Sequence, residues 1–155
     1  MTTELEYVLN KASAEQIAGH LSSCDADFMP ALSSRVAISD YAEKLASKSM
    51  RFEAWSGGLL VGLVAAYCND RERHIAFIST VSVLKAWTGK GIAANLLKQC
   101  MEYAKKTGMQ QVSLEVAGDN MPAIALYRKN GFVVNGVKES FVCMSLYLPG
   151  AAGHG

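Results

Sequence analysis

The stretch "TGKGIAANLL", from Thr88 to Leu97, constrains the possible fold more than any other part of this sequence. The apolar, β-branched run "HIAFISTVSVL" precedes it and predicts a strand that ends near Val83. Apolar residues then recur at helical spacing from about Gly91 to Thr107, which predicts an amphipathic helix. A strand that leads through a glycine-rich loop into a helix indicates an α/β chain in which the helix packs on a sheet.

The remaining segments predict the other elements of this domain. Gly57 and Gly58 separate two apolar runs and indicate a β-hairpin. Ser13 and Gln16 have the spacing of a capping box at the start of a first helix, and we expect Ser39 to cap a second one. The expected strands are 5–10, 50–56, 59–70, 74–84, 110–116, 132–134 and 140–148, and the expected helices are 10–24, 38–48, 91–107 and 119–132.

Length and composition fit one globular domain in the α/β (mixed α+β) class. The 155 residues show neither an internal repeat nor a linker, and half of them are hydrophobic, so a sizeable core can be buried. We expect the domain to span residues 1–148. The small residues of 149–155 predict a flexible tail, and their composition is compatible with a vector-encoded remnant.

Charge and cysteine content exclude several classes of function. The net charge is +1 without a block of like charges, which argues against a nucleic-acid partner. The N-terminus lacks the apolar core of a signal peptide and no apolar run could span a bilayer, so we expect a cytoplasmic protein without a membrane partner. The four cysteines have no short paired spacing, which favours free thiols and no metal site. We interpret His20 and His74 as surface or capping histidines.

The glycine loop has the chemistry of a phosphate site. Gly89 and Gly91 let a ligand approach the backbone, and the following helix points free amides and its positive dipole end toward it. Lys90 and Lys85 add positive charge nearby. A P-loop is excluded because Gly91 stands where the motif requires the residue after its lysine to be Ser or Thr. A Rossmann fingerprint is weak: Gly89, Gly91 and Ala94 fit it, but too few residues follow Glu115 for the remaining βαβ units.

A third interpretation comes from a resemblance carried by two separate segments. The first is the loop itself, with Trp87 as an aromatic, then Thr88, Gly91 and Ala93. It resembles the coenzyme A pyrophosphate loop of the GNAT N-acetyltransferase superfamily, aromatic-[Arg/Gln]-x-x-Gly-x-[Gly/Ala], although Thr88 departs from the usual Arg or Gln. The second, "NMPAIALYRKNGF" from Asn120 to Phe132, matches the superfamily's N-x-x-A-x-x-L-Y-x-x-x-G-F pattern at every marked position. "LEV", ending at Val116, precedes it as in ribosomal-protein N-terminal acetyltransferases.

The resemblance implies a fold and a reaction. It implies a mostly antiparallel sheet of six to seven strands, splayed between the strands that end at Val83 and Val116 and flanked by about four helices. It implies acetyl-coenzyme A as cosubstrate and direct acetyl transfer to a primary amine of a small molecule or a protein N-terminus. The implied coenzyme-binding residues are Val81, Ser82, Val83, Thr88, Gly89, Lys90, Gly91, Ile92, Ala93, Ala94, Asn120 and Tyr127.

The implied catalytic groups are Tyr127 as the general acid, the amide of Val83 as an oxyanion donor and Glu115 as the base. The strand before the loop has no carboxylate, so a water chain is an alternative to Glu115. A different class of function, a non-catalytic acyl-coenzyme A sensor of the same fold, is favoured by Thr88 and by that acid-free strand. Tyr41 and Lys44 share a helix face that could border the acceptor site. The sequence names neither the acceptor amine nor the choice between monomer and homodimer.

Overall fold

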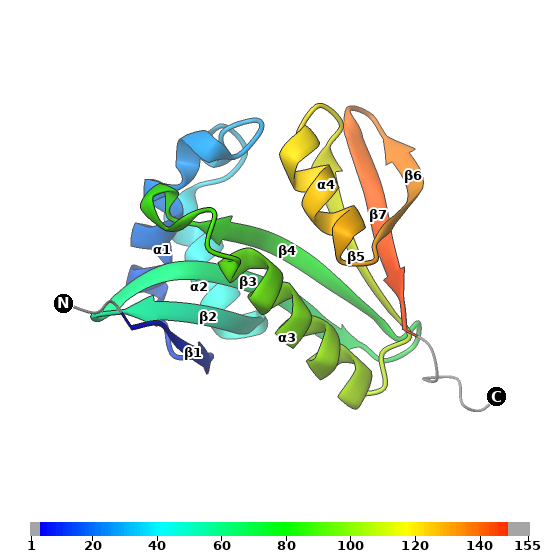
Figure 1. Ribbon diagram of the computed structural model, residues 1–155, viewed down its shortest axis with the longest axis horizontal. Coiled ribbons are helices and arrows are strands. Elements are labelled where there is room, and N and C mark those ends of the chain that lie inside the picture. The colour runs from blue at the N-terminus through cyan, green and yellow to red at the C-terminus, as the bar shows by residue number, and fades with distance from the viewer. Residues whose placement is uncertain (1–3, 149–155) are drawn as a thin grey trace.

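The computed structural model describes residues 4–148, which form one sheet with helices on both faces (Figure 1). The sheet has seven strands in the order β1-β2-β3-β4-β5-β7-β6, and only the β4–β5 pair is parallel. The predicted tail, 149–155, lies outside the described residues. The elements are β1 Glu6–Leu9, α1 Ala14–Ser23, η1 Asp25–Asp27, η2 Leu32–Ser34, α2 Ile38–Lys48, β2 Met50–Ser56, β3 Leu59–Asp70, β4 Ile75–Val83, η3 Lys85–Trp87, α3 Ile92–Lys106, β5 Gln111–Ala117, α4 Met121–Lys129, β6 Val133–Lys138 and β7 Phe141–Tyr147.

The local sequence signals account for most element ends. Ser13 and Gln16 form the predicted capping box at the start of α1. The Ser39 prediction is wrong: α2 begins at Ile38 after Ala37, which makes no side-chain cap. Ser39 therefore lies inside the first turn, two residues beyond the capping position. At the other end of α2, the Arg51 guanidinium donates to the carbonyls of Leu45 and Ala46, which satisfies acceptors that a helix leaves free.

Two apolar layers hold the helices to the sheet. On one face α1 and α2 bury Ile17, Leu21, Ala42 and Leu45 against β2 and β3. On the other face α3 buries its apolar stripe against the same strands, and α4 packs nearby over β5 (Figure 1). Gly62 on β3 is needed for this approach, because a Cβ there would lie 2.7 Å from the Ile92 side chain. The start of α3, and so the glycine loop before it, is therefore held close to the sheet.

The parallel strands β4 and β5 separate soon after they begin. Their pairing covers only Ile75–Phe77 with Gln111–Ser113, and no register continues beyond it. Figure 1 shows the two strands meeting at the lower right and diverging toward the glycine loop. Within β4, Thr80 pairs with Ala65 and Ile78 with Ala66, so Ser79 is a bulge that bends the strand. Six of the predicted site residues line the gap between these strands, whereas those of the glycine loop, residues 88–94, do not; the six are Val81, Ser82, Val83, Glu115, Asn120 and Tyr127.

Candidate active site

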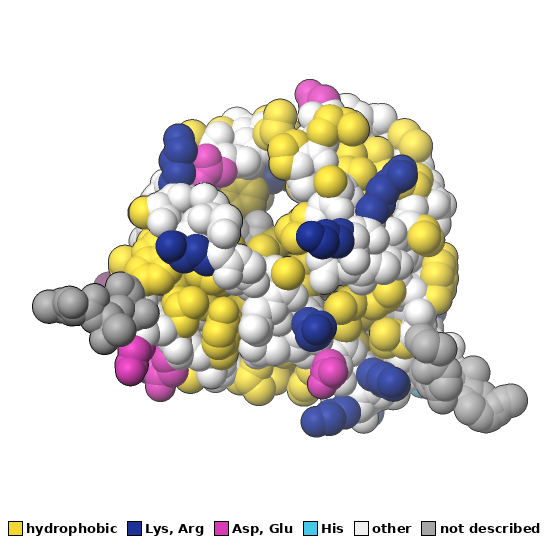
Figure 2. All heavy atoms as spheres, in the orientation of Figure 1, with side chains coloured by type: hydrophobic (Ala, Val, Ile, Leu, Met, Phe, Trp, Pro, Cys, Tyr) yellow, Lys and Arg dark blue, Asp and Glu magenta, His cyan; other side chains and the backbone are white. Residues whose placement is uncertain are grey.

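A cavity of about 400 Å³ occupies the gap between β4 and β5. One wall is β4, from Phe77 to Val83, and the opposite wall is β5 and α4. Figure 2 shows a hollow in the molecular surface between the part that contains β1–β4 and the part that contains β5–β7. Lys and Arg side chains flank the hollow on this face. The lining residues are Cys24, Asp27, Phe28, Met29, Leu32, Arg35, Val36, Tyr41, Phe77, Ser79, Thr80, Val81, Ser82, Val83, Glu115, Val116, Ala117, Asn120, Ala123, Tyr127 and Phe141.

The backbone of β4 points two amides into this gap. Leu84 N donates to Val61 O on β3 at 2.9 Å, and Val83 is in register with Gly62. Because amide direction alternates along an antiparallel strand, the amides of Val83 and Val81 point away from β3 and toward β5. They meet no strand there, since the β4–β5 pairing has already ended. This edge can donate hydrogen bonds to an extended ligand and to an oxyanion.

The glycine loop forms a separate cradle beyond that end of β4. Gly89 and Gly91 have φ of 79° and 78°, a left-handed conformation that other residues rarely adopt. Gly91 is the N-cap of α3 and offers no side-chain cap. Among residues 4–148, no partner accepts from the amides of residues 89–94. A turn of free amides on a helix N-terminus fits a diphosphate, whose oxygens would satisfy them.

Thr88 stands at the edge of this cradle but is engaged within its own turn. Its Oγ1 donates to Lys85 O at 2.8 Å, which closes the short helix η3. Lys85 and Lys90 are both exposed, and Trp87 anchors the loop by packing against the apolar layer under α3. The cradle therefore presents backbone amides and exposed lysines.

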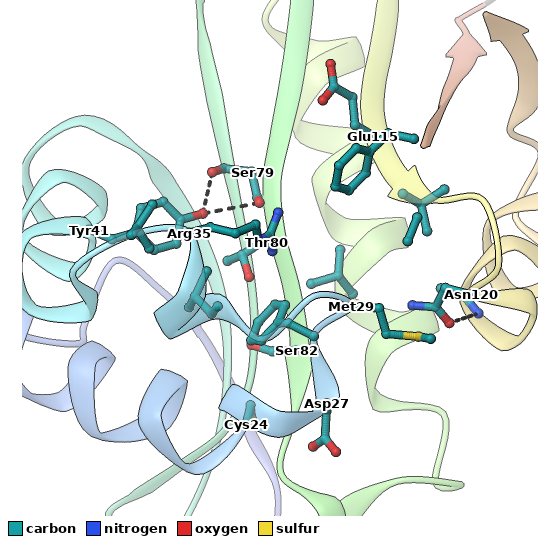
Figure 3. Close-up of a pocket in the computed structure, with 18 of the residues that line it drawn as sticks. Cys24, Asp27, Met29, Arg35, Tyr41, Ser79, Thr80, Ser82, Glu115 and Asn120 are labelled. Carbon is teal, nitrogen blue, oxygen red and sulfur yellow. Dashed lines mark hydrogen bonds between the residues drawn. The ribbon is translucent and has the colours of Figure 1, made fainter. Parts of the chain in front are cut away.

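Tyr127 and Asn120 belong to α4, on the far wall of the cavity. Tyr127 is 8% exposed, and its ring meets Phe132 edge-on at 5.9 Å. Burial raises the pKa of its hydroxyl to about 12, so the phenol remains protonated at neutral pH. Asn120 Oδ1 accepts from Ala123 N at 3.3 Å and caps the helix, as its sequence position predicts (Figure 3). Both side chains line the cavity.

Glu115 reaches the cavity from β5 but faces the other side of the sheet from Tyr127. Val112, Leu114 and Val116 point into the layer that contains Tyr127, so the alternate residue Glu115 points away from it. Its side chain is exposed, and no residue in 4–148 forms a salt bridge with it. The cavity therefore has a carboxylate on one side and a buried phenol on the other.

The segment between α1 and α2 supplies a wall that the sequence did not predict. Phe28, Met29, Leu32 and Val36 line the cavity, and the Arg35 guanidinium lies 6.0 Å from the Phe141 ring on β7. Figure 3 shows this segment facing Glu115 and Asn120 across the cavity. Residues 25–37 have no periodic pattern and contain only short 3₁₀ turns, so no sequence signal could indicate their role.

One helix residue, Tyr41 on α2, completes this side of the cavity. Tyr41 lines it and bonds both the carbonyl and the hydroxyl of Ser79, whereas Lys44 lies over the Tyr67 ring and outside the lining. The interpretation of His20 as a surface or capping histidine is wrong. It is only 4% exposed because the apolar face of α1 carries it onto the sheet. His74 is exposed, as predicted.

The negative predictions can be compared with the described residues. All four cysteines are free thiols, and within residues 4–148 no cluster of His, Cys, Asp and Glu could hold a metal ion. No helix in that range is long and apolar enough to cross a membrane.

Comparisons with known proteins agree with this geometry. A model of the acetyltransferase (GNAT) family matches residues 15–132. The chain is 36% identical over 93 residues to the N-alpha-acetyltransferase RimI of Mycobacterium tuberculosis, an alignment covering 59% of this chain and 57% of the relative. It is 31% identical over 83 residues to the N-alpha-acetyltransferase MAK3 of Arabidopsis thaliana, covering 53% and 44%. These alignments thus span about half the length of each relative.

A solved structure extends the likeness to nearly the whole chain. The PaiA N-acetyltransferase of Thermoplasma acidophilum, in complex with coenzyme A, superposes with a TM-score of 0.71 at 18% identity. The superposition covers 96% of this chain and 100% of that one. At this identity the likeness concerns the fold: the splayed sheet and the arrangement of helices around it.

Proposed function

Because this chain belongs to the acetyltransferase (GNAT) family, we propose that it transfers an acetyl group from acetyl-coenzyme A to a primary amine. The observation that carries the proposal is the cavity between β4 and β5. It joins free β4 amides, a buried protonated tyrosine and an exposed carboxylate in one space. Acetyl transfer from a thioester needs those three functions: an oxyanion donor, a proton for the departing thiolate and a group that receives the amine.

The coenzyme would extend along the open edge of β4. The pyrophosphate fits the free amides of residues 89–94 and the N-terminus of α3. The pantetheine fits the free edge at Val81 to Val83, with Ser82 and Asn120 beside it. The amide of Val83 would then donate to the thioester oxygen as negative charge develops there, with the parallel amide of Val81 next along the strand.

Tyr127 and Glu115, on opposite sides of the cavity, would carry out the proton transfers. Tyr127 would donate to the sulfur as the C–S bond breaks, because its raised pKa keeps the proton in place until the thiolate forms. Glu115 would bind the acceptor on the other side of the sheet, because its carboxylate attracts the acceptor's ammonium group. The ammonium would then give its first proton to this carboxylate. The acceptor reaches this side past Phe28, Met29 and Arg35.

The proposed acceptor is a primary amine of a protein N-terminus or of a small molecule. Two similar proteins are N-alpha-acetyltransferases, which favours the peptide α-amine. The cavity's mixed lining, apolar at Leu32 and Phe77 with Asp27 and Arg35 at its edge, also suits a small amine. We propose the peptide class as the first to test.

The test is acetyl-coenzyme A titration by calorimetry, followed by thiol release with four acceptors. The acceptors are a peptide with N-terminal alanine, spermidine, glucosamine and phenylalanine. Binding with turnover of at least one amine supports the transferase. Binding without turnover of any amine favours the sensor, and no binding contradicts both.

Thr88 provides a test of what the loop uses for binding. Because its Oγ1 is already bonded to Lys85 O, we expect Thr88→Ala to change acetyl-coenzyme A affinity by less than about 1 kcal/mol, the usual worth of a neutral hydrogen bond. Thr88→Arg should leave affinity equal or improve it. Calorimetric titration measures both variants. A much larger loss in Thr88→Ala would mean that the hydroxyl contacts the ligand directly.

Glu115→Gln tests whether Glu115 acts as the base or has no part in the reaction. If Glu115 takes the first proton from an ammonium, kcat/KM should fall by about 10²-fold or more for a strongly basic acceptor. The loss should shrink for an acceptor that is already neutral at the assay pH, since no first proton then has to be removed. An acceptor series of graded basicity, assayed at one pH, measures this trend. An equal loss across the series would assign Glu115 to acceptor binding, and no loss would favour water.

A further inference from the structure

His20 is a buried imidazole that the proposed reaction has not used. It comes from α1, is 4% exposed, and lies beneath the β4 wall of the cavity. Nδ1 is 2.9 Å from Leu60 O on β3, and Nε2 is 2.8 Å from Ser82 Oγ on β4. Both ring nitrogens therefore have a partner, and one of these partners lines the cavity.

The two partners determine which ring nitrogen carries the proton. The Leu60 carbonyl can only accept, so Nδ1 must be the protonated nitrogen. Nε2 then has a free lone pair, and the Ser82 hydroxyl donates to it. This is the arrangement of a hydroxyl that can pass its proton to a base while receiving another from a ligand.

Ser82 lies at the reacting end of the open strand. It stands between Val81 and Val83, whose amides point into the β4–β5 gap, and its side chain is on the α1 and α2 face of the sheet. Two residues away on the same face, Thr80 Oγ1 is buried without a hydrogen-bond partner among residues 4–148. Thr80 also lines the cavity. This face of β4 therefore carries two neighbouring hydroxyl residues in the cavity wall.

The reaction requires a second proton acceptor. An amine that attacks the thioester carbon becomes an ammonium in the tetrahedral adduct and must lose one more proton to give the amide. Glu115, if it acts, has already taken the first proton, and β4 has no carboxylate of its own. The hydroxyl of Ser82 is the cavity-lining group on β4 that has a neutral base behind it.

We propose that Ser82 and His20 form a relay that takes this second proton from the acceptor nitrogen. The inference rests on the proposed acetyl transfer. The nitrogen bonds to the acetyl carbon, and the C=O electron pair moves to oxygen. The N–H proton passes to Ser82 Oγ as the Ser82 proton passes to His20 Nε2. The oxygen pair then re-forms C=O, the C–S bond breaks, and sulfur takes the Tyr127 proton. Afterwards His20 returns its proton to solvent through Ser82, and Tyr127 regains one from water.

The surroundings of His20 keep it neutral and ready to accept. Burial is the largest influence and lowers the pKa of the imidazole below its ordinary 6.5, against smaller opposing effects of the Leu60 and Ser82 contacts. The titratable group that faces it is Cys24, whose Sγ is 3.9 Å from Nε2. Burial, and then the Asp27 charge, raise the pKa of that thiol to about 11, so it stays protonated. At neutral pH Nε2 is unprotonated, and it becomes protonated only as the pH falls below 6.5.

The experiment compares His20→Gln, Ser82→Ala and the double variant, with the acceptor of highest kcat/KM among the four amines above. Glutamine can still donate to Leu60 O and accept from Ser82, but it cannot take a proton. We expect kcat to fall by on the order of 10²-fold in each single variant. The double variant should be no worse than the poorer single one, because the two groups act as a unit. His74→Gln, the same substitution at an exposed site, should behave as the parent.

The pH profile distinguishes a relay from packing. In the parent, kcat should decline on the acid side with an apparent pKa below 6.5, and this decline should be absent from His20→Gln. Acetyl-coenzyme A affinity should remain close to the parent's in His20→Gln, since His20 does not line the cavity. Retention of more than a third of kcat in both single variants, or an unchanged acid limb in His20→Gln, overturns the relay. If the parent turns over none of the four amines, the proposed function fails and the relay with it.

Discussion

Tyr127→Phe is expected to lower kcat by roughly 10²- to 10⁴-fold, the usual contribution of one positioned general acid. The substitution removes only the hydroxyl that would protonate the thiolate. The ring remains, so its edge contact with Phe132 and the packing of α4 are kept. Melting temperature and acetyl-coenzyme A affinity should therefore hardly change. Steady-state kinetics with single-turnover analysis measure the loss and show that chemistry limits the rate.

Two further measurements sharpen the Tyr127 prediction. Tyr103→Phe removes a hydroxyl from another tyrosine that packs edge-on, against Phe52, and serves as the matched control with parent-like kcat. Burial raises the folded pKa of Tyr127 to about 12, above its ordinary 10, so the acid is lost only as pH rises toward 12. We therefore expect no basic limb from Tyr127 below about pH 11. A phenylalanine variant that kept more than about a third of kcat would remove Tyr127 from the chemistry.

Gly91→Glu is expected to weaken acetyl-coenzyme A binding by on the order of 100-fold. It places a carboxylate at the N-cap of α3, where the phosphate oxygens are proposed to lie. Two unit charges about 4 Å apart near a protein surface repel by about 4 kcal/mol before salt screening reduces this. A Cβ at Gly91 meets nothing within 4 Å, so steric overlap with the protein is not the cause.

Strain is the competing explanation, because Gly91 has a φ of 78°. Gly91→Ala introduces the same backbone cost without charge and should lose far less affinity. Gly108→Glu is the matched control: Gly108 has a φ of 85°, follows the other end of α3 and likewise has open space around it. Calorimetry should give parent-like affinity for this variant. Equal binding by the parent and Gly91→Glu would show that the diphosphate lies elsewhere.

Most element boundaries could be predicted because their causes are local. The capping box of Ser13 and Gln16 satisfies amides within one helical turn, and Asn120 caps α4 in the same way. Gly57 and Gly58 turn the β2–β3 hairpin without any distant partner. The Ser39 prediction was wrong because capping depends on where the helix begins, and α2 begins two residues earlier than a Ser39 cap would require. An offset of this size is enough to move a hydroxyl from the cap into the first turn.

The candidate site likewise has parts with local causes, which the sequence indicates, and parts that depend on distant contacts, which it does not. The family resemblance indicated the glycine loop, Asn120 and Tyr127, since these depend on short spacings along one loop and one helix. The free amides at residues 89–94 follow directly from two left-handed glycines and a helix start. The cavity wall opposite β5 and α4 could not be predicted in full, because Phe28, Arg35 and Phe141 come from irregular or distant segments that only the folded chain brings to one cavity.

The sequence by itself determined the order of elements, the glycine loop before α3 and the presence of a tyrosine and a glutamate on either side of one loop. Only the tertiary structure decided which faces they occupy. Strand alternation points Glu115 away from the layer that contains Tyr127, so the two residues line the cavity from opposite sides. Docking of α1 buries His20 against Ser82, residues that are 62 positions apart, and turns an apparent surface histidine into a buried one with a lowered pKa. No local pattern carries that information, because burial, and with it the protonation state of an imidazole, depends on what packs around it.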